Sequence, residues 1–311
     1  MINPYKNIAG LKTYKGDLHF HSTASDGKES PQAMFARLIE FGFDFCCLTD
    51  HDLPGNDTRF IGSLMVLPGQ EMSSDAGHIV SLFSKLIRDD DWTIKEQLEA
   101  IKESGGSAIL SHPKIREFVA DQGLAYSTER LLCEFPELYD GIEIYTHNVR
   151  SGFKLAVDRL DAIWSSYILT WGALHERPFV PVWGFASSDG HHTSHITKNV
   201  GIIVFADSKT EGNIRNSIET GAFYSLANSD ARFIRINESG GTFNVAADNA
   251  KMIKVVSTSG IILKTQYSGD REKAEICYKV DGTEGYIRFE AVDSYGHAAY
   301  TNPVFIGKFN V

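Results

Sequence analysis

Two histidines stand one residue apart near the start of the chain, in the stretch "GDLHFHSTASDG" of residues 16–27. Side chains at positions i and i+2 of a strand point to the same face, so His19 and His21 can both reach one metal ion. Asp26 follows after a short loop and could reach the same place. Taken alone, the histidines could instead lie on a solvated strand face, with Asp26 as an ordinary turn residue before glycine.

Titratable residues also end the apolar run that begins at Phe43, where "LTDHD" supplies Asp50, His51 and Asp52. His51 is a candidate metal ligand, and Asp50 is a candidate partner that fixes the tautomer of its imidazole ring. Asp52 could support the site or act in catalysis, or it could simply cap the next element. Three such groups in succession are unusual for a plain strand end, which favours a functional site.

Other apolar runs end in histidine or carboxylate residues, and each could singly be a buried side chain bonded to the backbone. Together the candidate metal ligands number nine: His19, His21, Asp26, His51, Glu71, His78, His112, Asp189 and His191. At three or four protein ligands per ion, with the Glu71 carboxylate bridging, this set fits two or three ions. The mixture of imidazole and carboxylate suits zinc, manganese or iron, and it suits calcium poorly.

The elements that must position these residues alternate between strand and helix over the first two-thirds of the chain. Apolar runs predict strands over residues 43–52, 64–71, 78–83, 107–113, 141–147, 180–189 and 201–206. Amphipathic or capped stretches predict helices over residues 30–42, 93–106, 151–174 and 210–223. This alternation predicts a parallel α/β barrel or sheet, and in such barrels sites form at the carboxyl ends of the strands.

The pattern changes after Asn228, where alternating apolar and polar residues replace the helical stretches. In residues 286–291, Ile287 and its alternate neighbours face one side, and Tyr286 and its alternate neighbours face the other. Asp281-Gly282 is a hairpin signal. We therefore predict two domains, an α/β barrel over residues 1–228 and a small all-β sandwich over residues 229–311.

Composition limits the classes of partner and compartment. The 311 residues are 42% hydrophobic and carry a formal net charge of −10, which disfavours a nucleic acid polymer as partner but allows a small anionic substrate beside bound cations. There is neither an apolar run long enough to span a membrane nor a secretory h-region near the start. The four cysteines lack ladder or CxxC spacing, so we expect buried free thiols and a cytoplasmic location.

The ordered motifs "HFH", "SDG", "TDH", "GQE", "GH", "SHP" and "SDGH" resemble those of the PHP (polymerase and histidinol phosphatase) superfamily. The resemblance implies a distorted (β/α)7 barrel with a two- or three-metal site. It implies a first ion held by His19, His21, Glu71 and Asp189, a second held by Glu71, His78 and His112, and a third held by Asp26, His51 and His191. It also implies that Glu143 lies near the site without ligating. The C-terminal part resembles the β-sandwich of a branch that includes carbaryl-hydrolase-type enzymes.

The resemblance implies a metal-dependent phosphoesterase that hydrolyses a small phosphorylated metabolite or nucleotide through a metal-bound hydroxide. Candidates for protonating the leaving group are Asp52, His192 and His147. Phosphate could be held by Lys114, Arg116 or Lys198, each of which could equally be a solvated surface charge. Two alternatives stay open: a carbamate, amide or ester hydrolase that uses the same metals, and a metal-binding regulatory or interaction protein without turnover. No membrane partner is expected.

Overall fold

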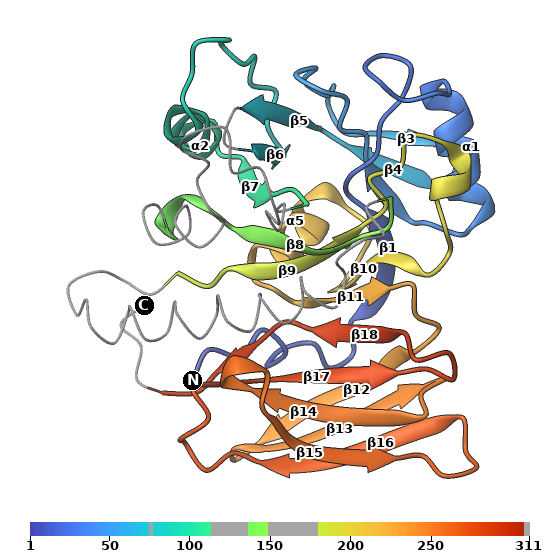
Figure 1. Cartoon of the computed structure of the whole chain (residues 1–311), viewed down its shortest axis with the longest axis vertical. Coiled ribbons are helices and arrows are strands. Elements are labelled where there is room, and N and C mark those ends of the chain that lie inside the picture. Colours follow the sequence, from blue (N-terminus) through green and yellow to red (C-terminus); the bar gives the residue numbers. More distant parts are fainter. Residues whose placement is uncertain (75–76, 113–135, 149–179, 308–311) are drawn as a thin grey trace, which may run out of the picture. The chain divides into compact units, whose positions relative to one another are not determined.

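The computed structural model describes residues 1–74, 77–112, 136–148 and 180–307 of the chain (Figure 1). These residues fall into two compact units. The site unit comprises the described residues within 14–157 and 180–201, and the β-rich unit comprises those within 1–13 and 202–311. The chain is thus a mixed α/β protein with many strands and few helices in its described part. The domain boundary expected after residue 228 stays a prediction.

Strands of the site unit belong to two sheets. In one sheet the strands follow the order β1 (Lys12–Asp17), β2 (Phe45–Cys47), β4 (Leu64–Leu67) and β3 (Arg59–Ile61). The other sheet has the order β5 (Gly69–Ser74), β6 (Gly77–Leu82), β7 (Ser107–Leu110), β8 (Gly141–Thr146) and β9 (Trp183–Ser187). The pairs β1–β2 and β2–β4 are parallel, as are β7–β8 and β8–β9, whereas β3 runs antiparallel to β4.

Two isolated parallel bridges join the ends of these strands. Phe20, which follows β1, pairs with Gly190, which follows β9, and His51, which follows β2, pairs with Glu71 in β5. These bridges bring residues of both sheets together at the predicted metal ligands. A complete (β/α)7 barrel stays a prediction, and the helix expected over residues 151–174 lies outside the described residues.

The expectation of an all-parallel sheet is wrong at β6, which runs antiparallel to both β5 and β7. Only two residues separate β5 from β6, and a parallel pair needs a crossover connection of about a dozen residues or more. His78 therefore lies near the start of its strand and not at its carboxyl end. Since β6 runs in the opposite direction, its start still lies beside the end of β5, where Ser73 pairs with His78.

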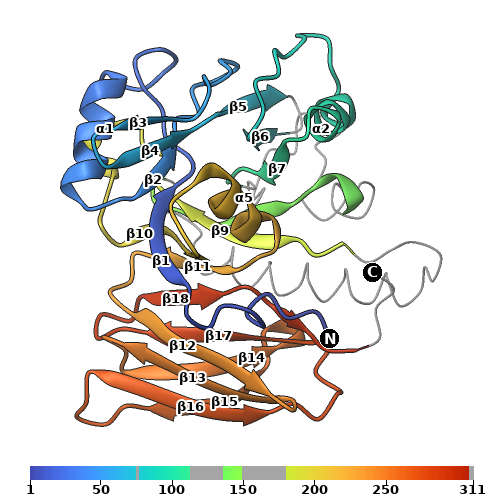
Figure 2. The same ribbon diagram turned by 180° about the vertical axis from the view of Figure 1, so that it is seen from behind.

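Both predicted helices within the described part of the site unit are present. Helix α1 (Pro31–Glu40) starts at the Ser30 cap, whose hydroxyl accepts a hydrogen bond from the Ala33 amide. It packs Met34, Phe35 and Leu38 against residues of β4, and Figure 2 shows the helix beside this strand. Helix α2 (Ile94–Glu103) starts with a capping box and buries the predicted face of Ile94, Leu98 and Ile101.

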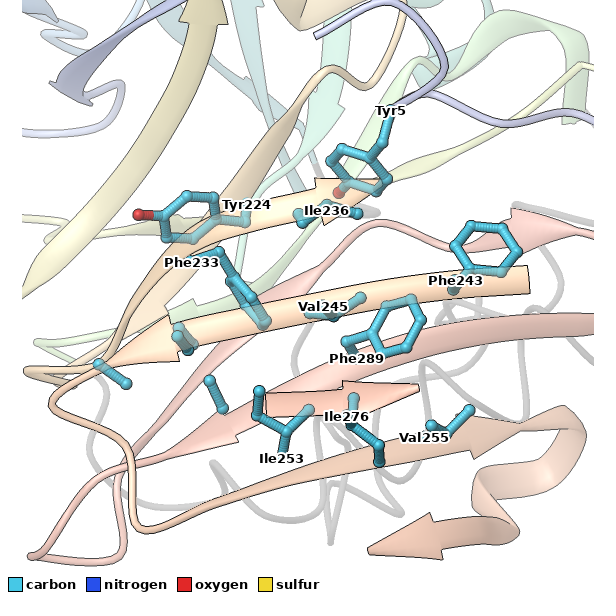
Figure 3. Packing of buried hydrophobic residues seen from close by; sticks show 14 of the residues in the cluster. Tyr5, Tyr224, Phe233, Ile236, Phe243, Val245, Ile253, Val255, Ile276 and Phe289 are labelled. Atoms are coloured by element: carbon cyan, nitrogen blue, oxygen red, sulfur yellow. The ribbon is translucent and has the colours of Figure 1, made fainter. Parts of the chain in front are cut away.

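The β-rich unit contains two sheets and helix α5 (Glu211–Glu219). One sheet has the order β15 (Ile262–Tyr267), β14 (Met252–Ser257), β17 (Tyr286–Val292), β18 (Ala298–Thr301), β11 (Phe223–Ala227) and β10 (Val200–Ala206), and β19 (Val304–Phe305) pairs with β17. The other sheet has the order β12 (Arg232–Ser239), β13 (Thr242–Asp248) and β16 (Lys273–Lys279). Their apolar side chains share one core, which Figure 3 shows around Phe233, Phe243 and Phe289.

Tyr5 joins this core from the start of the chain (Figure 3). Its buried hydroxyl donates to the Phe223 carbonyl over 2.6 Å and accepts from the Asn302 amide over 2.6 Å. The first residues of the chain are therefore part of the same core as residues near its end.

The turn signal at Asp281-Gly282 does not form a hairpin, because β16 and β17 belong to different sheets. The Glu284 carboxylate instead accepts hydrogen bonds from the amides of Asp281 and Gly282, over 2.8 and 2.9 Å. A two-residue hairpin joins β12 to β13 through Gly240 and Gly241, whose φ angles of 57° and 78° suit a turn that needs positive φ at both positions.

The predicted alternation in β17 is present, although both of its faces are buried. Ile287, Phe289 and Ala291 belong to the shared core. On the other face, Arg288 donates to Glu290 over 2.6 Å, so neither buried charge lacks a partner.

The cysteines follow the expectation only in part. Cys46 and Cys47 are buried free thiols, whereas Cys277 is free but exposed because it alternates in β16 with the core residue Ile276. Cys133 lies outside the described residues. Within residues 1–74, 77–112, 136–148 and 180–307, no helix is long and apolar enough to cross a membrane.

Candidate metal centre

His19 and His21 follow the end of β1 and are fully buried. Their Nε2 atoms lie 3.1 Å apart, so the two imidazoles face one point, as the i, i+2 spacing predicts. Oε2 of Glu71 lies 3.2 Å from each of these nitrogens, and Oδ1 of Asp189 lies 3.5 Å from the first and 3.3 Å from the second. The structure thus brings together four residues from three separate segments, because His19 and His21 share one.

Two oxygen atoms at this point are buried and have no hydrogen-bond partner among the described residues, namely Oε2 of Glu71 and Oδ1 of Asp189. A buried carboxylate oxygen without a partner is costly. A divalent cation between these oxygens and the facing imidazole nitrogens would supply the missing interaction. Imidazole and carboxylate together are ligands that zinc, manganese and iron accept, so the residues present fit a metal ion.

Four groups of potential ligands occur in the described part of the chain, and the ligand atoms within each group lie within 4.8 Å of one another. The groups are His19, His21 and Glu71; His19, His112 and Asp189; His51, Glu71 and His78; and His21, Asp26, His51 and His191. Together they contain all nine residues proposed from the sequence. The assignment of particular residues to a first, second and third ion stays a prediction.

Glu71 lies at the centre of these groups, with its two oxygens facing different imidazoles. Oε1 lies 3.1 Å from Nδ1 of His78 and 3.0 Å from Nε2 of His112. Oε2 faces His19 and His21, as described above. Burial raises the pKa of Glu71, but the imidazoles of His19, His112 and His21 outweigh it and hold the pKa far below its usual range. The charged form of this carboxylate is therefore favoured, and each of its oxygens faces a different pair of imidazoles.

Glu143, in β8, is buried and holds two of the candidate ligands. Its Oε1 lies 2.8 Å from Nδ1 of His19, and its Oε2 accepts a hydrogen bond from the His112 amide over 2.6 Å. The hydroxyl of Ser187 donates to the same carboxylate over 2.5 Å. With Nδ1 engaged by Glu143, Nε2 of His19 points into the cluster, an arrangement that is common where a carboxylate orients a metal-ligating histidine.

The carboxylates around His19 favour the protonated, positively charged form of its imidazole. Burial lowers the pKa of His19, but Glu71, Glu143 and Asp189 outweigh this effect and raise the pKa well above its usual value. A protonated imidazole cannot ligate a metal, so an ion that bound at His19 would displace a proton, and its affinity would depend on pH.

Asp17 and Asp50 support the backbone around the site. Oδ1 of Asp17 accepts from the Ser188 amide over 3.2 Å, and burial raises the pKa of Asp17 to about 6. Asp50 accepts from the amide and hydroxyl of Ser22, each over 2.7 Å, and so holds the loop that leads to Asp26. The expected contact between Asp50 and the His51 ring is absent among the described residues, where Nδ1 of His51 instead lies 3.3 Å from the Ser73 hydroxyl.

A close approach of the backbone explains why a glycine, Gly27, follows Asp26 in the "SDG" motif. A Cβ atom at Gly27 would lie 2.7 Å from backbone atoms of both His21 and Ser22, which is closer than real Cβ contacts. The loop can therefore fold back onto the first ligand segment only without a side chain here. This close approach places Oδ2 of Asp26 3.0 Å from Nε2 of His191.

The three candidate proton donors lie outside the four ligand groups. Asp52 accepts a hydrogen bond from the Ser73 amide over 3.0 Å. Nδ1 of His192 accepts from the Ser194 amide over 3.1 Å, and its Nε2 lies 3.3 Å from Glu29. His147 is buried, and its Nδ1 lies 3.0 Å from the Tyr145 hydroxyl.

Among the basic residues proposed to hold phosphate, Lys114 and Arg116 lie outside the described residues. The Lys198 carbonyl accepts a hydrogen bond from Lys15. Sequence reasoning missed Arg88, whose Nη1 lies 3.6 Å from Oδ2 of Asp52. The only signal was a basic residue soon after a predicted strand, within "SKLIRDDD", and no motif marks it.

Comparison with known proteins gives limited sequence similarity. No family model matches the chain. It is 30% identical over 106 residues to the 5'-3' exoribonuclease Rnm of Escherichia coli, a match that covers 34% of this chain and 32% of that protein. It is 29% identical over 115 residues to an uncharacterized protein of Methanocaldococcus jannaschii, covering 32% of this chain and 67% of that protein. The chain thus spans about a third of the length of the exoribonuclease.

Structural similarity extends over nearly the whole chain. A two-domain protein from Bacteroides vulgatus, described as containing a predicted PHP-like metal-dependent phosphoesterase, matches with a TM-score of 0.53 and 15% identity. The match covers 96% of this chain and 97% of that protein. The chain therefore has the fold of a two-domain PHP-like protein, which confirms at the level of the fold the resemblance inferred from the motifs.

Proposed function

We propose that this protein is a metal-dependent phosphoesterase of the PHP superfamily that hydrolyses a small phosphorylated metabolite or nucleotide. The observation that carries the proposal is the position of Glu71, whose two oxygens face different imidazoles while Oε2 lacks a hydrogen-bond partner among the described residues. This geometry suits two or three divalent ions, and the ligand types suit zinc, manganese or iron.

When bound, divalent cations at such a site polarise a phosphoryl oxygen and lower the pKa of water. The chain's own residues hold the geometry, with Glu143 orienting His19 and Asp50 fixing the loop of Asp26. Asp52, His192 and His147 stay candidates for donating a proton to the leaving group. Asp52 is the neighbour of His51 in the chain and bonds to the strand that carries Glu71.

The relative named as a 5'-3' exoribonuclease supports a phosphoester as the bond that is cleaved. The net charge of −10 favours a small substrate over a long nucleic acid, because polyanion binding depends on basic residues. We also propose a cytoplasmic location, since Cys46 and Cys47 are adjacent buried thiols and no disulfide occurs within the described residues.

The test uses the full chain loaded with manganese, zinc or iron. It measures hydrolysis of phosphomonoesters, phosphodiesters, a short RNA and aryl carbamates, together with bound metal. Glu71→Gln should lose metal and activity together, and the matched control is Glu275→Gln, whose side chain lies exposed on β16. Turnover of a phosphoester that depends on Glu71 would support the proposal.

Other outcomes would favour the alternatives. Turnover of carbamates, amides or esters without turnover of phosphoesters would make the protein a different metal-dependent hydrolase. Full metal occupancy without turnover of any substrate would favour a metal-binding regulatory or interaction protein. Retention of metal and activity in Glu71→Gln would show that the cluster is not the active site.

A further inference from the structure

Arg88 lies in the connection between β6 and α2. It approaches the part of the candidate metal centre that contains His51, which we call the His51 side. Its Nη1 lies 3.6 Å from Oδ2 of Asp52. The other carboxylate oxygen of Asp52 accepts a hydrogen bond from the amide of Ser73, whose hydroxyl lies 3.3 Å from Nδ1 of His51. Two residues, Asp52 and Ser73, therefore link the guanidinium group to a candidate metal ligand.

The guanidinium of Arg88 is largely buried but poorly satisfied. Its side chain is only 15% exposed, and its Nε is buried without a hydrogen-bond partner among the described residues. The 3.6 Å separation from Asp52 is too long for a good hydrogen bond. The same Nη1 donates a hydrogen bond to Asp90 over 3.0 Å, but Asp90 is 96% exposed, and such surface pairs contribute little. Arginine cannot relieve its burial by losing a proton, so these contacts leave a cation with unused donors.

Three other basic side chains in the described part of the site unit have partners away from the cluster. Lys15 donates to the Phe41 carbonyl, Lys85 pairs with Asp57, and Lys102 pairs with Asp140. A positive side chain outside the metal ligands would add to the attraction that bound cations exert on an anionic substrate. Arg88 is placed to provide this charge.

We propose that Arg88 binds an oxyanion group of the substrate, either a phosphate or a carboxylate, at the His51 side of the metal centre. The inference rests on the proposed function and makes Arg88 a residue that determines specificity for charged substrates. The planar fork of a guanidinium matches two oxygens of such a group, and lysine offers only a point charge.

The test measures binding of inorganic phosphate and of benzoate to the metal-loaded full chain by calorimetry, in wild type, Arg88→Lys and Arg88→Met. It also measures KM and kcat for a phosphomonoester, bound metal and the unfolding temperature. Arg215→Met is the matched control, because this arginine pairs with Glu219 on the surface of α5. Arg88→Met should weaken oxyanion binding and raise KM, each by at least about tenfold. This is the change expected when one charge-assisted hydrogen bond is lost.

Bound metal and unfolding temperature should stay unchanged in Arg88→Met, and Arg88→Lys should recover part of the affinity. The probe whose affinity depends on Arg88 identifies the oxyanion as phosphate or carboxylate. If wild type binds neither probe, if neither affinity depends on Arg88, or if the variants lose metal instead, the proposal is wrong. If phosphate binding depends on Arg88 but no phosphoester is cleaved, the proposed function fails and the anion site stands.

Discussion

The Nδ1 atom of His19 lies 2.8 Å from Oε1 of Glu143, and both side chains are buried. The same carboxylate accepts the amide of His112, so one residue of β8 fixes candidate ligands that follow β1 and β7. Glu143 therefore orients the ring of His19 and holds the backbone of His112, although it belongs to none of the four groups of potential ligands.

Replacing Glu143 with glutamine should lower metal affinity by about tenfold to hundredfold, the usual effect of removing a carboxylate that orients a ligand. Glutamine keeps the size of the side chain but removes the charge that aligns His19. Competition with a chromophoric chelator would measure the affinity, with Glu275→Gln as the control. An unchanged affinity in Glu143→Gln would show that His19 needs no such support.

Removal of metal should lower the stability of the wild-type chain. A ligand that binds only the folded state at a hundred times its Kd stabilises that state by about 2.7 kcal/mol. Glu71→Gln should lose most of this gain, because Glu71 belongs to two of the four ligand groups. Thermal unfolding with manganese and with EDTA would measure the difference, and an equal gain in variant and wild type would contradict the bridging position of Glu71.

Gly27→Ala should destabilise the site unit by about 1–3 kcal/mol, because the new Cβ would meet the backbone of His21 and Ser22 at 2.7 Å. It should also weaken binding of the ion nearest Asp26. The control is Gly212→Ala in α5, where nothing lies within 4 Å and alanine should stabilise the helix by about 0.5–1 kcal/mol. Urea unfolding measures both changes, and equal effects at the two positions would refute the close approach at Gly27.

Asp17→Asn should stabilise the metal-free chain above pH 6. Burial raises the pKa of Asp17 from 3.8 to about 6, so the folded state binds this proton more tightly than the unfolded state does. The charged form thus costs stability above pH 6, and the cost disappears as the pH falls toward 3.8. Since one pKa unit corresponds to about 1.4 kcal/mol, the variant should gain about 3 kcal/mol at pH 8 and almost nothing near pH 4.

Denaturant unfolding in EDTA at several pH values would measure this gain. Asparagine keeps the oxygen that accepts from Ser188 and carries no charge at any pH, so the pH dependence of the gain isolates the charge. A gain that does not depend on pH would show that Asp17 does not titrate in this range.

Sequence reasoning found the nine residues that the structure groups together, because they lie beside short apolar runs and several carry two-residue spacing, as His19 and His21 do. It also found the start of α1, because the Ser30 cap and Pro31 are local signals. It missed the reversed direction of β6, although the short connection from β5 leaves no room for the crossover that a parallel pair needs. Arg88 was missed for a different reason, because its nearness to Asp52 arises only when the connection after β6 folds back.

The place of Tyr5 in the β-rich unit has a consequence for synthesis on the ribosome. Its hydroxyl joins Phe223 to Asn302, so that core cannot be complete until residues near 302 have emerged. All residues of the site unit are translated before residue 202. Because domains generally fold as they are made, we expect the strands of the site unit to assemble first. The first residues of the chain, which include Tyr5, can pack only after the last strands of the β-rich unit have been synthesised.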